Sequence, residues 1–125
     1  MPPRYAALRQ RHTGALLLPR VRLCTSFWSR GRGLMFRRGL TPGEAIVLDE
    51  QRDSRAATAI HMFWVPFPIA AVWINTAGQV VDKALALPWR PFYGPRAPAR
   101  YILETEPAFL DRIAITDEVD FVPGA

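Results

Sequence analysis

The 125-residue sequence contains a single cysteine, Cys24, and only two histidines, His12 and His61. One cysteine cannot form an internal disulfide, and these three side chains are too few to build a structural zinc site. A chain of this length can bury one hydrophobic core without such cross-links. The composition therefore predicts one domain that folds without a metal ion, a disulfide or another cofactor.

Long hydrophobic runs are also missing. The longest apolar stretch, residues 62–74, is interrupted by Pro66 and Pro68 and does not reach the roughly 18 residues that span a bilayer. Near the N-terminus, the apolar run at 15–18 is shorter than the roughly 7 residues of a signal-peptide core, and arginines follow it closely. We therefore expect no membrane span and a cytoplasmic location.

Acidic residues are absent from the first 43 positions, which carry nine arginines and a charge of +9. From Glu44 onward, seven bases and eleven acids give a charge of −4, and Lys83 is the only lysine. Such asymmetry can mark a nucleic-acid-binding surface, although binding tails usually carry denser blocks of like charge. Nucleic-acid binding through the arginine-rich N-terminal part therefore remains an alternative, not the favoured function.

Short apolar runs separated by proline and glycine predict a mainly β chain. Residues 1–14 have few aliphatic side chains and are expected to form a disordered basic leader, followed by a single β domain at 15–125. The polar segment 49–58 is expected to be a loop. Strands are predicted at 16–23 (an edge strand, because of Pro19), 45–48, 60–65, 69–74, 80–87, 101–105 and 119–122, and short helices at 27–35 and 107–112.

Two turns can be predicted from their residues. Proline followed by glycine predicts a type II turn at 41–44, and Asn75 to Gly78 predicts the turn of a β-hairpin that covers 69–81. Six or seven short strands with one or two short helices are typical of a small β-sandwich or barrel and argue against an α/β fold.

The order of several motifs resembles a known family. They are Gly33-Leu34-Met35-Phe36-Arg37, Pro42-Gly43-Glu44, the run from His61 to Ile69, Gly78-Gln79-Val80-Val81, Pro88-Trp89-Arg90 and Ala99 to Glu104. Together they resemble the prokaryotic family catalogued as domain of unknown function 192, over about residues 21–121. The resemblance implies a β-sandwich or barrel of jelly-roll type, with no established activity or cofactor.

Three positions depart from what this resemblance implies. The family commonly has acids where this chain has Ala70 and Asn75, and a glycine where it has Thr116. A family activity that used either acid would be lost in this chain. The last turn of the chain would differ in shape because of Thr116.

Few side chains offer catalytic chemistry. His61 is the one histidine inside the expected domain, and no serine or cysteine lies in a nucleophile-elbow setting. A small hydrolase or lyase would require His61 to meet an acid such as Asp82 or Glu104 in one cleft. No glycine-rich phosphate loop, metal-ligand spacing or dinucleotide fingerprint occurs. We assign no catalytic residue and no metal ligand, and we favour a protein that is not an enzyme.

Aromatic residues offer the better candidates, since the chain has four tryptophans and seven phenylalanines. Trp89 and Arg90 lie in a proline-rich loop that cannot be buried deeply without leaving backbone groups unpaired. With His61, Trp64 and Arg37 they form the expected ligand-binding set, because aromatic faces stack on sugars and guanidinium groups bind anions. The favoured function is a non-catalytic module that binds a small polar or carbohydrate-like ligand, or a segment of a partner protein.

The same residues also allow a purely structural interpretation. The tryptophans could be ordinary core residues, and Arg37 or Arg100 could form a structural ion pair with Glu104. The oligomeric state cannot be inferred from the sequence.

We expect no measurable binding of random-sequence DNA or RNA at physiological ionic strength, because the arginines are dispersed along the chain. Fluorescence anisotropy with labelled single-stranded and duplex oligonucleotides measures this directly. A submicromolar affinity that falls steeply with added salt would contradict the expectation, since that dependence is the signature of phosphate contacts.

Overall fold

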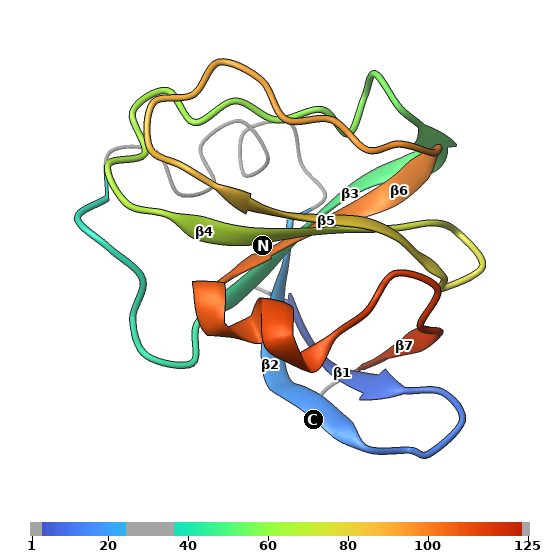
Figure 1. Ribbon diagram of the computed structural model, residues 1–125. Coiled ribbons are helices and arrows are strands. Elements are labelled where there is room, and N and C mark those ends of the chain that lie inside the picture. The colour runs from blue at the N-terminus through green and yellow to red at the C-terminus, as the bar shows by residue number, and fades with distance from the viewer. Residues whose placement is uncertain (1–3, 25–36, 124–125) are drawn as a thin grey trace.

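The structure is a computed structural model that describes residues 4–24 and 37–123. Within these ranges, seven strands form one curled sheet with the order β5-β4-β6-β3-β2-β1-β7 (Figure 1). The predicted mainly β fold of the sandwich or barrel type is confirmed. The elements are β1 (Arg4–Gln10), β2 (Leu16–Cys24), β3 (Ala45–Ser54), β4 (Ile69–Ile74), β5 (Val80–Ala86), β6 (Ala99–Thr105), the 3₁₀ helix η1 (Pro107–Arg112) and β7 (Val119–Pro123).

Strand β4 lies at the centre of the hydrophobic core, because all six of its residues are buried. Successive side chains of a strand point to opposite faces of the sheet. Val72 and Ile74 therefore join one cluster of buried residues, whereas Ala71 and Trp73 join a second cluster on the other face. Both faces of the sheet must be covered by other parts of the chain.

The first face is covered by η1, whose Phe109 is buried in the cluster that contains Val72, and by the curled part of the sheet, since buried residues of β1, β2 and β7 belong to the same cluster. Lys83 fixes the end of this helix, since its Nζ donates hydrogen bonds to the carbonyl oxygens of Leu110 and Ile113 at 2.7 and 2.8 Å. The only lysine of the chain thus satisfies two carbonyl groups that the end of a helix leaves unpaired. Among the described residues, no helix is long and apolar enough to cross a membrane.

The second face is covered by two long loops, residues 55–68 and 87–98. Met62 and Val65 of the first loop are buried against the sheet. Trp73 is buried beneath the same loop, and its Nε1 donates a hydrogen bond to the carbonyl oxygen of Thr58 at 2.7 Å. The largest side chain of the core therefore also has its polar atom satisfied.

The expectation of a disordered leader at residues 1–14 is wrong for residues 4–10, which form β1. This strand pairs antiparallel with β2 on one side and with β7 on the other. Ala6 and Leu8 are buried. The short alternation of small and apolar residues is a weak local signal, and β1 is stabilised by pairing with β2, which follows it, and with β7, which is distant in sequence.

Strand β2 is not the edge strand that Pro19 suggested, because it lies between β1 and β3. The pairing of β1 with β2 shifts register between the pairs Ala6–Val21 and Leu8–Leu18. Pro19 falls at this irregularity, where its missing N–H interrupts no regular pair.

Two further expectations are corrected, and one lies outside the described residues. Residues 60–65 do not form a central strand, since only an isolated bridge joins Ile60 to Tyr93. The buried side chains at 62 and 65 come from a loop, and their apolar pattern resembles that of a strand. Strand β3 continues to Ser54, so part of the predicted loop 49–58 is extended. The helix predicted at 27–35 falls outside the described residues.

The predicted hairpin at 69–81 is confirmed as β4 and β5, and its turn depends on Gly78. The φ of Gly78 is 88°, and a Cβ on it would lie 2.5 Å from the carbonyl oxygen of Val119. The same turn is held by Arg11, whose Nη2 donates to the carbonyl oxygen of Ala77 at 2.8 Å. Arg11 also forms ion pairs with Glu118 and Asp120, so it joins the hairpin turn to the segment around β7.

Thr116 has a φ of 82°, a conformation that β-branched residues rarely adopt. It is the third residue of a turn in which the N–H of Asp117 donates to the carbonyl oxygen of Ala114 at 3.1 Å. A turn with positive φ at this position normally has glycine there. The departure noted in the sequence is therefore a site of backbone strain.

We expect Thr116→Gly to raise the free energy of unfolding by about 1 kcal/mol, because glycine adopts a positive φ without a Cβ clash. Urea titration of both proteins measures the difference. Thr116→Ala is the matched control, since it removes the hydroxyl and keeps the Cβ. An increase in Thr116→Ala as large as in Thr116→Gly would contradict the explanation.

Candidate functional site

The two loops that cover the second face run side by side over the sheet (Figure 1). Their backbones form a short ladder in which buried Met62 both donates and accepts a hydrogen bond. The bonds are Ile60 N to Tyr93 O, Tyr93 N to Ile60 O, Met62 N to Arg90 O and Trp89 N to Met62 O, at 2.7–2.9 Å. The positions of the two loops are therefore coupled to each other and to the core.

Trp64 of one loop and Trp89 of the other meet at the molecular surface. Their ring centroids lie 5.2 Å apart with an interplanar angle of 67°, an edge-to-face contact. Each residue keeps 50% of its surface exposed. The φ angles are 64° and 66°. A positive φ costs a non-glycine residue about 1–2 kcal/mol, and such strain is concentrated at functional sites.

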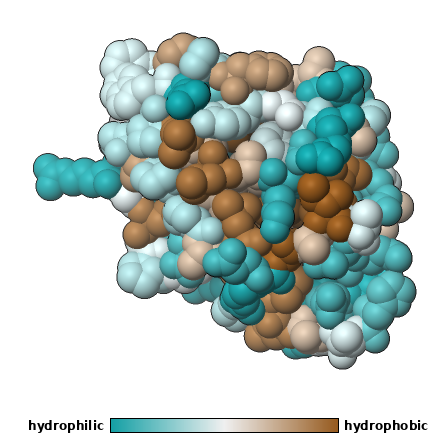
Figure 2. Space-filling view, viewed as in Figure 1, coloured by the Kyte–Doolittle hydropathy of each residue, from teal (hydrophilic) through white to brown (hydrophobic). Residues whose placement is uncertain are grey.

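His61 and Arg90 are exposed on the same two loops. The Nδ1 atom of His61 accepts a hydrogen bond from the N–H of Phe63 at 3.2 Å. The neutral ring therefore carries its proton on Nε2, where it can donate to a ligand. Phe63 is 43% and Phe92 69% exposed, and apolar side chains lie along the upper edge of the molecule over these loops (Figure 2).

Of the five predicted ligand-binding residues, the structure brings Trp64 and Trp89 into contact and places His61 and Arg90 on the same loops. Arg37 has a different environment. Its two terminal nitrogens donate to the two carboxylate oxygens of Glu44 at 2.5 and 2.6 Å. Together with its other surroundings, this bond lowers the pKa of Glu44.

The prediction that Arg37 or Arg100 forms an ion pair with Glu104 is wrong, because both arginines pair with other acids. Arg37 pairs with Glu44, as described above, and Arg100 donates to both carboxylate oxygens of Asp49 at 2.8 and 3.0 Å. Arg37 and Arg100 therefore belong to two separate ion pairs.

The contact required by a hydrolase or lyase is not made in the described part of the chain, where no hydrogen bond or ion pair joins His61 to Asp82 or Glu104. Asp82 instead accepts a hydrogen bond from the N–H of Arg96 at 3.0 Å. No three His, Cys, Asp or Glu side chains among the described residues gather as they would around a metal ion.

At the two positions where the family resemblance implies acids, the side chains of this chain have structural roles. Ala70 is fully buried in the same cluster as Val72. The side-chain oxygen of Asn75 accepts a hydrogen bond from the N–H of Gln79 at 2.9 Å in the hairpin turn.

Glu104 is the one described group with a large shift of its pKa. It lies in β6, only 7% exposed, and its neighbours on the adjacent strands are Ile46 and Ala71. Burial raises the pKa of its carboxyl group to about 7. No hydrogen bond among the described residues involves this carboxyl. The alternation of β6 places Glu104 on the same face as Ile102, which is the signal by which the sequence could have indicated its burial.

The curled sheet, covered on both faces, and the exposed loops define a small mainly β protein of the sandwich or barrel type. The model of the family DUF192, described as "Uncharacterized ACR", matches residues 8–121. The chain therefore belongs to this family, as its motifs indicated.

Relatives named UPF0127 protein occur in archaea. The protein of Thermococcus sibiricus is 36% identical over 112 residues, which are 86% of this chain and 70% of the relative. The protein of Thermococcus kodakarensis is 34% identical over 103 residues, which are 82% of this chain and 63% of the relative. The second relative is thus considerably longer than the matched region.

Two crystal structures have the same fold. A protein of Sinorhizobium meliloti, described as a candidate transcription regulator, gives a TM-score of 0.80 at 21% identity, covering 96% of this chain and 94% of the other. A protein of unknown function from Novosphingobium aromaticivorans gives 0.78 at 19% identity, covering 93% and 83%. At these identities the likeness extends to the fold alone.

We expect the free energy of unfolding to fall by about 3 kcal/mol as the pH rises from 4.5 to 7, because of Glu104. In this window the native state keeps a proton that the unfolded state, with an ordinary pKa of 4.5, has released. Above about pH 8 both states have lost the proton and the effect levels off. The pKa values of Glu44 and Glu118 are lowered in the native state. The stability that these two groups contribute is therefore lost only as the pH falls below 4.5.

Urea titrations at pH 5 and pH 8 measure this fall. Glu104→Gln, which cannot ionise, should reduce it sharply, whereas the control Glu106→Gln, at an exposed position in the same segment, should leave it unchanged. Equal falls in the wild type and in Glu104→Gln would show that another group is responsible.

Proposed function

We propose that this protein is a non-catalytic binding module that takes a carbohydrate-like ligand on the surface formed by Trp64 and Trp89. The observation that carries the proposal is the pair of half-exposed tryptophans, each held at a positive φ. A buried indole contributes to stability wherever it is placed. These two residues keep half of their surface exposed and so contribute less through burial, and ligand binding would account for their being held at strained positions.

The two loops supply what a sugar site needs. Apolar faces of sugar rings stack on indole rings, and hydroxyl groups need hydrogen-bond partners at the rim. His61 and Arg90 are exposed donors on the loops that carry the tryptophans. The backbone ladder around Met62 holds the loops before a ligand arrives, so little conformational entropy is lost on binding.

An apolar segment of a partner protein is the competing occupant of this surface. It would make use of Phe63 and Phe92, which are also exposed, in addition to the tryptophans. The hydrolase or lyase alternative has no contact in its favour, because His61 meets neither of the acids that were considered.

We expect at least one sugar in a panel of mono- and oligosaccharides to bind, and Trp64→Ala and Trp89→Ala each to weaken this binding by about tenfold or more. The loss corresponds to about 1.4 kcal/mol or more, the scale of one aromatic contact. Isothermal titration calorimetry measures it. Trp89→Gly is a sharper variant, because it removes the ring and relieves the positive φ, so it should lose binding without losing stability.

Phe92→Ala is the matched control, as it removes an exposed aromatic ring from the same loop. It should leave sugar binding within about twofold of the wild type. A greater loss of sugar binding in Phe92→Ala than in Trp89→Ala would contradict the tryptophan surface as the site, and no binding by any sugar would favour a partner segment as the occupant. If the protein hydrolysed a substrate and His61→Ala abolished that turnover, the binding-module proposal would fail.

A further inference from the structure

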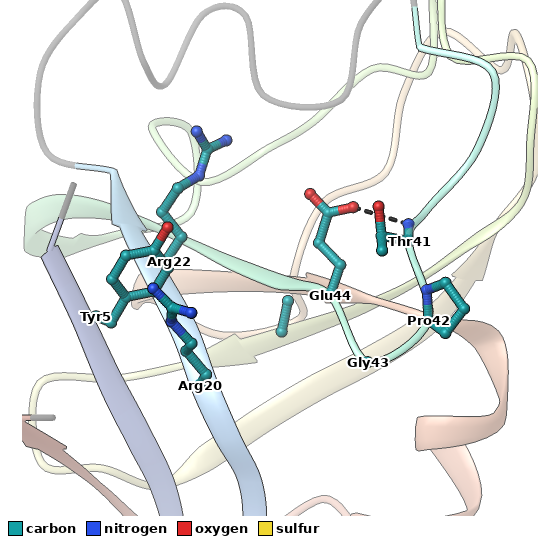
Figure 3. A pocket seen from close by; sticks show the side chains of 8 residues that line it. Tyr5, Arg20, Arg22, Thr41, Pro42, Gly43 and Glu44 are labelled. Atoms are coloured by element: carbon teal, nitrogen blue, oxygen red, sulfur yellow. Dashed lines mark hydrogen bonds between the residues drawn. The ribbon is translucent and has the colours of Figure 1, made fainter.

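A pocket lies away from the two loops, between β1, β2 and the turn that precedes β3 (Figure 3). It is a pocket of about 240 Å³. One wall carries Tyr5, Arg20 and Arg22, and the opposite wall is the turn at 41–44. Gly43 has a φ of 78°, and the N–H of Glu44 donates to the carbonyl oxygen of Thr41 at 2.9 Å, as predicted for this turn.

The charges around this pocket are unequal. The carboxylate of Glu44 is engaged by two nitrogens of Arg37 and by the N–H of Thr41 at 2.9 Å. Its negative charge is balanced mainly by Arg37, although the charge of Arg22 also contributes to the lowered pKa of Glu44. Neither Arg20 nor Arg22 forms an ion pair with a carboxylate in the part of the chain that the structure describes. The pocket thus has an excess of two positive charges.

Arg20 and Arg22 both lie on β2, and their positions depend on the pairing of this strand with β1. Tyr5 of β1 pairs with Arg22 of β2 in the sheet register. The guanidinium carbon of Arg20 lies 3.9 Å from the centroid of the Tyr5 ring, a cation–π contact between two side chains that line the pocket (Figure 3). A planar guanidinium held on an aromatic ring loses little freedom when it binds an oxyanion.

We propose that this pocket binds a phosphate group, either as inorganic phosphate or as the monoester group of a small molecule. Guanidinium groups bind phosphate oxygens through paired, charge-assisted hydrogen bonds, and the Tyr5 hydroxyl adds a further donor. Two unbalanced positive charges match a phosphate dianion better than they match a single carboxylate. The volume is below the roughly 300 Å³ of a pocket that encloses a drug-sized ligand, so it suits one small group.

The site is independent of the tryptophan surface, and its test does not involve a sugar. The ¹⁵N-labelled protein is titrated at constant ionic strength with inorganic phosphate, with glycerol 2-phosphate and with acetate. We expect both phosphates, or one of them, to shift the amide signals of Tyr5, Arg22 and Gly43. A response to the monoester alone identifies a phosphorylated molecule as the ligand, and a response to both identifies the phosphate group itself.

Substitutions test whether the pocket or the general charge is responsible. Arg20→Gln and Arg22→Gln should each weaken phosphate binding by about tenfold, and Arg22→Lys, which keeps the charge and loses the planar fork, by less. Arg52→Gln is the matched control, because it removes the same charge at an exposed position of β3 outside the pocket.

Three results would overturn the proposal. They are no site-specific shifts at millimolar phosphate, acetate binding as tightly as phosphate, and a loss of affinity in Arg52→Gln equal to that in Arg22→Gln. Thermal unfolding of each variant shows that it is folded. If Arg22→Gln does not fold, Arg22→Lys and Arg20→Gln decide the question.

Discussion

The burial of β4 on both of its faces is the constraint on which the rest of the structure depends. A sheet strand with no exposed side chain needs a layer on each side, and a chain of 125 residues has little material for two layers. In the described part of the chain, one layer consists of the short helix η1, held by Lys83, together with β1, β2 and β7 of the curled sheet. The other consists of the two loops at 55–68 and 87–98, which cover Trp73 without regular secondary structure of their own.

This use of loops as a covering layer explains why the candidate site is where it is. A loop that covers a core must be fixed, and here Met62 is fixed through its side chain below and through its backbone on both sides. Once Met62 is held, the neighbouring Trp64 and Trp89 have little freedom left. Their strained backbones are then supported by contacts that the core requires in any case, so a rigid surface is obtained from segments that would otherwise be mobile.

The parts of the fold that could be predicted are those with local signals. The β4–β5 hairpin, the turn at Gly43 and the 3₁₀ helix that begins at Pro107 each depend on dihedral preferences of a few adjacent residues. β1 could not be predicted, because its stability comes from pairing with β2 and β7 and not from its own composition. Residues 60–65 were misassigned for the opposite reason, since their apolar pattern is real but belongs to a loop that faces the core.

The site could be predicted only as a set of candidates. Exposed aromatic residues in proline-rich loops indicated Trp64 and Trp89, but neither their contact nor their positive φ values have a local signal. The partner of Arg37 was wrong because Arg37 pairs with nearby Glu44, whereas the alternative acid, Glu104, is buried in β6. The pocket beside Tyr5 was missed because residues before 15 were expected to be disordered.

The pairing of β1 with β7 also affects how the chain folds during its synthesis. The pair Leu8–Phe121 joins the first described strand to the last, so its loop-closure entropy is among the largest that this chain can incur. Contacts of such long range slow folding. During synthesis on the ribosome, β1 can pair with β2 early, while its other edge keeps unpaired backbone groups until β7 has emerged. For that interval the nascent chain presents an open strand edge, the feature that most readily captures a second chain, and Arg11 can help to close it only when Glu118 and Asp120 arrive.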